Sequence, residues 1–119
     1  MTPDREAVLK IMVIGPDGTQ SMVEAIIDTG FTEEMTLPPA VVSLLKLPFR
    51  TAALMKLADG SDVMMDAYDA DVVWHGSPRR IIVYAAEGSS LIGISLLYGS
   101  RLTLDAIDGG NVEISPLIR

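Results

Sequence analysis

The sequence predicts an all-β fold, closed or sandwiched, on three observations. Short runs rich in Val, Ile and Leu dominate the chain, turn signals return about every dozen residues, and the few helical stretches are short. At 119 residues the chain has the length of one domain, so we expect residues 1–119 to form a single domain with residues 1–6 as a flexible terminus. Its 49% apolar and 21% charged residues indicate a globular protein.

Composition also excludes several classes of function. The net charge of −7 argues against a nucleic-acid partner, because phosphate binding needs a cationic face. Cysteine is absent, which excludes disulfides, thiolate catalysis and Cys-based zinc sites. The lone histidine, His75, and the absence of a phosphate-cradling Gly-rich loop give no support for a metal or a cofactor. No apolar run approaches the roughly 20 residues that cross a bilayer, so we expect a cytoplasmic protein without membrane contact.

The first half of the chain reads as a hairpin, a strand and a helix. Gly15-Pro16-Asp17-Gly18 is a strong turn signal between Val8 to Ile14 and Met22 to Asp28, which predicts a β-hairpin. A short strand, Met35 to Leu37, follows. Pro39 suits the first turn of a helix over Ala40 to Leu45, for which the expected apolar face consists of Val41, Leu44 and Leu45.

The second half reads as further hairpins around one short helix. Asp59-Gly60, between the runs Leu54 to Ala58 and Val63 to Tyr68, is among the best short-range hairpin signals. The next segments, in order, are a strand continuing over Ala70 to His75, a turn Gly76-Ser77-Pro78, a strand Arg79 to Ala86, a helix Ile94 to Tyr98 ended by Gly99, and a last hairpin of Arg101 to Ile107 with Val112 to Ser115.

The segment Ile26-Ile27-Asp28-Thr29-Gly30 carries the clearest chemical signal. An acid directly after a β-branched apolar run is unusual, because a strand that enters a core normally ends on a turn residue that faces water. The alternative without a catalytic role is that Asp28, Thr29 and Gly30 form an ordinary turn. The order hairpin, apolar pair, Gly-containing loop and short helix occurs again over Ala70 to Tyr98, which indicates an internal pseudo-duplication.

With these motifs in order, the chain resembles the single-domain, retroviral-type (retropepsin-like) aspartic proteases, including the small stand-alone forms that bacteria encode. Three pieces carry the resemblance: Asp28-Thr29-Gly30, a flap-like hairpin tip Ala58-Asp59-Gly60-Ser61, and Leu91-Ile92-Gly93 followed by a helix. It covers about Val8 to Ile114. It implies a closed β-barrel with a flap hairpin and a psi-shaped turn, in which the segment before Gly93 crosses behind the Asp-Thr-Gly loop.

The resemblance also implies a mechanism and a partner. Peptide hydrolysis without a metal needs one carboxylate and one carboxylic acid, and two close carboxyls share a single proton because their like charges oppose double ionisation. This chain has one such motif, so a homodimer with Asp28 from each subunit is expected. In this family the Thr29 hydroxyl donates across the dimer axis, and Gly30 allows close backbone approach.

The expected substrate is an extended peptide held between the flaps and the active-site loops. Besides the flap tip Ala58 to Ser61, the candidate wall residues are Leu57, Val63, Met64 and Ile92, and their apolar character favours hydrophobic residues around the cut. Phe31 stands where the family usually carries a small residue, so it would crowd the entrance or add a pocket wall. The alternative function is therefore an inactive protease-like module that binds peptides or dimerises.

Overall fold

The computed structural model describes residues 1–56 and 59–117, and over these residues the chain forms nine strands and two short helices. The strands are β1 Val8–Ile14, β2 Gln20–Ile27, β3 Met35–Leu37, β4 Phe49–Lys56, β5 Asp62–Trp74, β6 Ser77–Ala85, β7 Ser90–Ile92, β8 Ser100–Leu104 and β9 Val112–Pro116; the helices are α1 Pro39–Leu44 and α2 Ile94–Leu97. The predicted all-β fold is confirmed.

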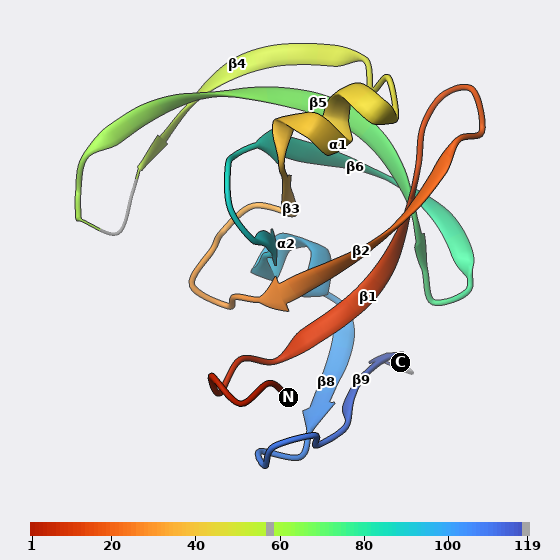
Figure 1. Cartoon of the computed structure of the whole chain (residues 1–119), viewed down its shortest axis with the longest axis vertical. Coiled ribbons are helices and arrows are strands. Elements are labelled where there is room, and N and C mark those ends of the chain that lie inside the picture. Colours follow the sequence, from red (N-terminus) through yellow and green to blue (C-terminus); the bar gives the residue numbers. More distant parts are fainter. Residues whose placement is uncertain (57–58, 118–119) are drawn as a thin grey trace.

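Six of the strands close into a barrel (Figure 1). They run in the order β1-β2-β7-β3-β6-β5, and β5 returns to β1 through the pair Val13 and Val72. Closure removes the open edges that a flat sheet would leave. Of the two architectures that the sequence allowed, the structure has the closed barrel.

Turn chemistry accounts for the hairpins. The Gly15 N–H donates to the Thr19 carbonyl at 2.8 Å, and β1 and β2 pair antiparallel on either side, as predicted. The β4–β5 hairpin projects from the barrel as a long curved arm (Figure 1). At its tip Gly60 has φ of 87°, and the Asp59 carboxylate accepts from the Ser61 N–H at 2.9 Å. The Ser61 hydroxyl also donates to this carboxylate, which lowers the pKa of Asp59 below its usual value.

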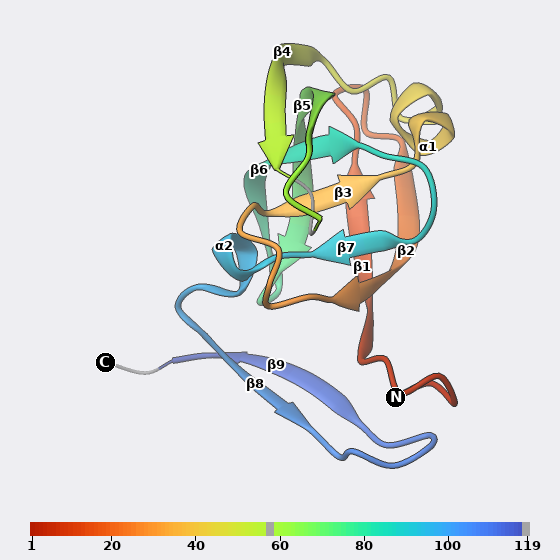
Figure 2. The ribbon, with the colours of Figure 1, turned by 90° about the vertical axis from the view of Figure 1, so that its left-hand side faces the viewer.

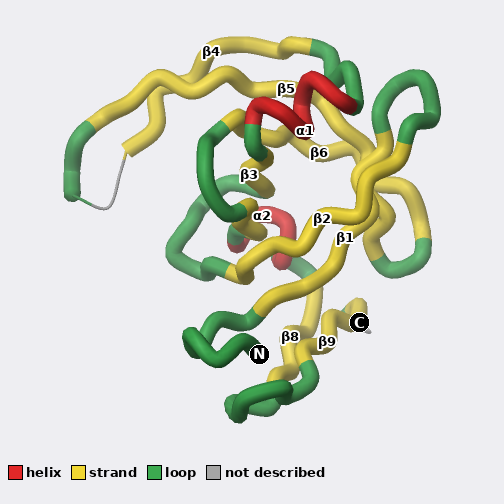
Figure 3. Tube along the Cα trace, in the orientation of Figure 1, coloured by secondary structure: helices red, strands yellow, loops and turns green. Residues whose placement is uncertain are grey.

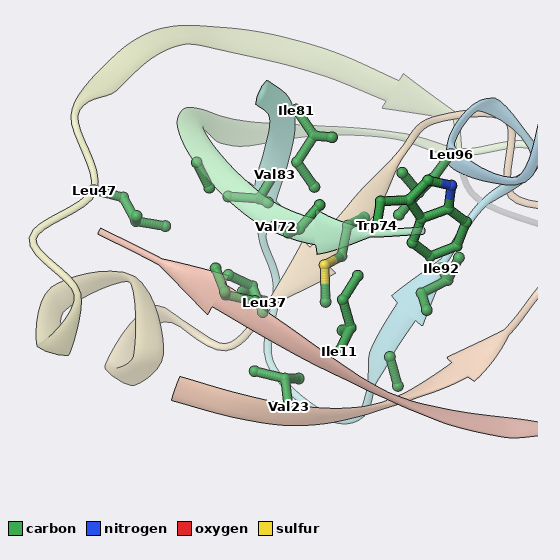
Figure 4. Close-up of a cluster of buried hydrophobic side chains, with 14 of the residues drawn as sticks. Ile11, Val23, Leu37, Leu47, Val72, Trp74, Ile81, Val83, Ile92 and Leu96 are labelled. Atoms are coloured by element: carbon green, nitrogen blue, oxygen red, sulfur yellow. The ribbon is translucent and has the colours of Figure 1, made fainter. Parts of the chain in front are cut away.

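The barrel interior is filled by alternate residues of the strands, because successive side chains of a strand point to opposite faces. Figure 4 shows this core, to which Leu47 of the loop before β4 and Leu96 of α2 also contribute. Its labelled side chains are Ile11, Val23, Leu37, Leu47, Val72, Trp74, Ile81, Val83, Ile92 and Leu96. Each of these is less than 9% exposed, and the burial of their apolar surface stabilises the fold.

Strand β7 lies between β2 and β3, although β2 and β3 are consecutive in the chain (Figure 2). It is parallel to β2, with Ile27 opposite Ile92, and antiparallel to β3, with Met35 also opposite Ile92. The loop over residues 28–34 must therefore cross the end of β7, which is the psi-shaped arrangement. The successions β1-β2-β3-α1 and β5-β6-β7-α2 agree with the predicted pseudo-duplication.

Two local predictions are corrected by the structure. Helix α1 buries Val42, and the following Leu45 is also buried, whereas Leu44 is 63% exposed, so the apolar face expected to include Leu44 is wrong. The turn expected at Gly76-Ser77-Pro78 lies one residue earlier, because Trp74 already pairs with Ser77 across it. His75 takes the left-handed conformation there, with φ of 53°.

The last two strands, β8 and β9, form a separate two-stranded sheet below the barrel (Figure 2). The chain start lies against the loop between them: the Met1 amino group donates to the Gly110 carbonyl at 2.9 Å, and the Gly109 N–H donates to the Met1 carbonyl at 3.1 Å. Across residues 1–56 and 59–117, neither helix is long and apolar enough to span a bilayer.

Candidate active site

Asp28 follows the last residue of β2 and is fixed through its backbone on both sides. Its N–H donates to the Ile92 carbonyl of β7 at 2.9 Å, and its carbonyl accepts from the Phe31 N–H at 3.1 Å. One carboxylate oxygen, Oδ1, accepts from the Gly30 N–H at 3.0 Å. Asp28 is half-buried, whereas Thr29 and Gly30 are exposed. The acid is therefore held in one orientation by a tight turn rather than left on a free loop.

The segment from β7 into α2 braces this turn from behind. The Gly93 N–H donates to the Glu34 carbonyl at 2.9 Å, and the Ile94 N–H donates to the Phe31 carbonyl at 2.8 Å. The Ser95 hydroxyl adds a hydrogen bond to the Thr32 carbonyl, so the loop between β2 and β3 runs beside α2, as Figure 3 shows. These bonds give partners to backbone groups of a loop that is partly buried against α2.

The absence of a side chain at Gly93 makes this close approach possible. A Cβ atom there would lie 2.0 Å from the Glu33 carbonyl oxygen and 2.7 Å from Phe31 Cδ2. Its φ of −95° is open to any residue, so the requirement for glycine is steric and not conformational. Gly93 therefore sets how tightly the loop that carries Asp28 packs on α2.

Asp28 lines a pocket of about 650 Å³ that lies between the barrel and the β4–β5 hairpin. Its lining residues come from the Asp-Thr-Gly loop, β3, both strands of the hairpin and the segment from Ala86 to Leu91; they are Asp28, Gly30, Phe31, Thr32, Glu33, Thr36, Leu54, Met55, Lys56, Met65, Ala86, Glu87, Ser89 and Leu91. The pocket has the volume of a typical ligand site and combines apolar walls with a few acids.

The structure brings some of the predicted site residues together and leaves others out. Asp28, Gly30 and Phe31 line the pocket, and Thr29 is exposed beside it. Asp59, Gly60 and Ser61 form the hairpin tip but do not line the pocket. Predictions for Leu57 and Ala58 fall outside the described residues.

Three predicted wall residues do not line this pocket. Ile92 is fully buried in the barrel core, and its neighbour Leu91 lines the pocket instead. Met64 is 59% exposed and lies on the outer face of the hairpin, because the half-buried residues alternate with it. Val63 shares the inner face with Met55, its cross-strand partner, but only Met55 lines the pocket.

The pocket is also lined by Met55, Met65, Glu33 and Thr36, none of which was predicted from the sequence. The two methionines could have been predicted from the strand register that the Asp59-Gly60 turn sets, because this register places Met55 and Met65 on one face of the hairpin. No local pattern marks the other two, whose contacts are long-range: the Thr36 hydroxyl accepts from the Leu91 N–H at 2.9 Å.

Glu33 is the second acid of the pocket that has a fixed partner. Its Oε2 accepts from the Tyr84 hydroxyl at 3.0 Å. Tyr84 is 7% exposed, and its burial together with the Glu33 carboxylate raises the pKa of its hydroxyl to about 12. Tyr84 thus stays protonated at ordinary pH and keeps donating to Glu33.

The site offers carboxyl chemistry and no ready place for a metal. Within residues 1–56 and 59–117, no three His, Asp or Glu side chains are grouped closely enough to hold an ion. His75, which was predicted at a hairpin end, is exposed, its Nε2 lies 2.8 Å from the Ser100 hydroxyl oxygen, and it does not line the pocket. A positioned carboxylate beside an apolar pocket supports acid–base chemistry on a bound ligand.

Comparison with solved structures agrees with this geometry. The EIAV protease, solved in complex with an inhibitor, superposes with a TM-score of 0.61 over 82% of this chain and 89% of that chain, at 15% identity. The chain has a retropepsin-like fold. At 15% identity this similarity concerns the fold alone and not the activity. No family model matches the chain, and no curated protein matches it.

Proposed function

We propose that this protein is an aspartic endopeptidase that works as a homodimer, with Asp28 of each subunit at one shared active site. The observation that carries the proposal is the place of Asp28: it sits in an Asp-Thr-Gly turn, braced by the psi crossing, and it lines a pocket of about 650 Å³ beneath a projecting hairpin. The retropepsin-like fold is the scaffold on which a retroviral protease carries its activity.

The chemistry explains why two subunits are required. An ionised carboxylate takes a proton from water as the water oxygen attacks the peptide carbonyl, while a protonated carboxyl donates to the carbonyl oxygen. Aspartic proteases generally solve this with two close carboxyls that share one proton. Each chain contributes one Asp-Thr-Gly turn, so the second carboxyl comes from a second copy. The exposed Thr29 then donates its hydroxyl to the partner's loop and holds the two turns together.

Exposed apolar side chains near the turn support this assembly. Ile94 and Tyr98, at the two ends of α2, are 41% and 79% exposed, and Ile94 is hydrogen-bonded to the Asp28 loop. The β8–β9 hairpin exposes Leu104 and the loop residue Ile107. The hairpin meets the rest of its own subunit at α2, at β1 and at the chain start, and a two-stranded hairpin without further packing is at best marginally stable in water. Burial of these surfaces against a second copy would stabilise both the hairpin and the dimer.

The substrate in this proposal is an extended peptide bound between the hairpin and the Asp28 loop. The hairpin acts as a flap whose inner face presents Met55 and Met65, two flexible thioether side chains that adapt to varied shapes. Phe31 and Leu91 supply the opposite apolar wall. These walls favour hydrophobic residues on either side of the cut.

The test is cleavage of a pooled peptide library by wild type, Asp28→Asn and Asp17→Asn, with the molar mass measured in the same buffer. Asp17 is an exposed acid in the β1–β2 turn and does not line the pocket, so it is the matched control. We expect a dimeric wild type and Asp17→Asn to cleave and Asp28→Asn to be inactive. Cleavage by Asp28→Asn would contradict the proposal. A folded dimer that binds peptides without cleaving them would favour the binding-module alternative, in which Phe31 blocks the site.

A further inference from the structure

Glu34 is the last residue before β3 and closes the loop that begins at Asp28. Its side-chain Oε1 accepts from the Ile82 N–H of β6 at 2.9 Å, and its main-chain carbonyl accepts from the Gly93 N–H at 2.9 Å. One residue thus ties the loop both to the barrel wall and to the segment in front of α2. Glu34 does not line the pocket, so its carboxylate has no direct contact with a ligand bound there.

The hydrogen bond from the Ile82 N–H to the Glu34 side chain continues the hydrogen-bonding pattern between β3 and β6 by one residue. Strands β3 and β6 pair in parallel from Met35 and Val83 onward, so Ile82 lies one residue before the ladder begins. Its N–H would have no backbone acceptor from β3 at this point, and the Glu34 carboxylate takes that place. The C-terminal end of the loop is therefore bound to β6 one residue before β3 begins.

Arg79 connects the same carboxylate to α2. Its Nη2 lies 3.6 Å from Glu34 Oε2, and its Nη1 donates to the Leu96 carbonyl at 3.4 Å. That carbonyl belongs to the last turn of a short helix, where backbone acceptors lack partners within the helix. Arg79 thus joins β6, the Glu34 side chain and α2.

We propose that Glu34, together with Arg79, is a positioning residue for Asp28. Two hydrogen bonds connect Glu34 to Asp28. The Glu34 carbonyl accepts from the Gly93 N–H, and the carbonyl of Ile92, which precedes Gly93, accepts from the Asp28 N–H. Fixing Glu34 on β6 fixes this pair of bonds and with it the direction of the Asp28 carboxylate. The inference rests on the proposed function, since it assigns the role of a supporting residue in that active site.

The Glu34–Arg79 pair is suited to a local role. Its side chains are 21% and 39% exposed, and partly exposed ion pairs contribute little to global stability. A loss of this pair should therefore change the loop more than the barrel. Displacement of a reacting group by about 1 Å lowers rates by about 10²-fold.

The experiment compares Glu34→Met, which removes the acceptor of the Ile82 N–H, and Arg79→Met with Arg80→Met in the 119-residue chain. Arg80 is the neighbouring residue of β6, and it pairs at 2.7 Å with Asp71 on the outer surface, away from the loop. With a peptide that wild type cleaves, we expect Glu34→Met to lower kcat by about 10- to 100-fold with KM little changed. We expect Arg79→Met to cause a similar loss, Arg79→Lys to recover part of it, and Arg80→Met to behave as wild type.

Amide hydrogen exchange gives a second readout that does not depend on catalysis. The N–H groups of Asp28 and Gly93 should exchange faster in Glu34→Met and Arg79→Met, while the N–H of Val13 in the barrel core should be unchanged. Wild-type exchange at Asp28 and Gly93 in both variants would overturn the inference. Inactive wild-type protein would contradict the proposed function, and exchange alone would then decide whether Glu34 holds the loop.

Discussion

Replacing Gly93 by alanine tests whether the brace behind Asp28 is as tight as the structure shows. The added Cβ would lie 2.0 Å from the Glu33 carbonyl oxygen, whereas a carbon and an oxygen in contact need about 3.3 Å. The loop must therefore move by about 1.3 Å, because the obstacle is backbone and cannot rotate away. Overpacking of this kind costs about 1–3 kcal/mol, and a shift of this size at a catalytic group lowers the rate by about 10²-fold.

The matched control is Gly15→Ala. A Cβ at Gly15 would lie 2.2 Å from the Leu45 carbonyl oxygen, an equally severe backbone contact that involves no residue of the pocket. Urea unfolding should show a loss of about 1–3 kcal/mol in both variants. Peptide cleavage per folded molecule should fall about 10²-fold only in Gly93→Ala. Wild-type kcat/KM in Gly93→Ala would refute the link between this packing and Asp28.

Three further predictions concern the pocket and the assembly. Phe31→Ala removes one apolar wall and should raise KM for peptides with large hydrophobic residues, measured against a small-residue peptide series; unchanged KM across both would contradict the wall assignment. Burial and the Glu33 carboxylate raise the pKa of Tyr84 to about 12, so this group stabilises the fold below pH 10 and the contribution is lost as the pH rises toward 12; urea midpoints should fall more over that window in wild type than in Tyr84→Phe, and an equal fall in both would contradict this contribution. Leu104→Asp places a charge on the β8–β9 hairpin and should lower the molar mass toward that of a monomer and lower the urea midpoint, because association no longer stabilises the subunit; a variant that stays dimeric would contradict the placement of this hairpin in the interface.

The hairpins and the Asp28 turn could be predicted because their signals are local. Asp17-Gly18 and Asp59-Gly60 define turns through backbone chemistry, and each turn sets the register of the strands beside it. The short helix α1 was harder, because six residues offer too few apolar positions to fix a face, and tertiary packing chose Val42 over Leu44.

The missed and misplaced site residues depend on distant partners. Glu33 and Glu34 contact Tyr84 and the Ile82 N–H, which lie 51 and 48 residues further along the chain. Local pattern carries no information on such pairs. Ile92 was assigned to the pocket because it precedes Gly93 in the motif, but strand alternation turns it into the core and leaves Leu91 facing the pocket.

Subunit mixing tests most directly whether one active site takes an Asp28 from each of two chains. A fixed amount of wild type is equilibrated with increasing amounts of Asp28→Asn, and peptide cleavage is followed alongside the molar mass. If the site is shared, mixed dimers are inactive, so activity should fall with the wild-type fraction and approach zero at a large excess of the variant. Activity that stays proportional to the wild-type protein added, while mixed dimers form, would contradict the shared site.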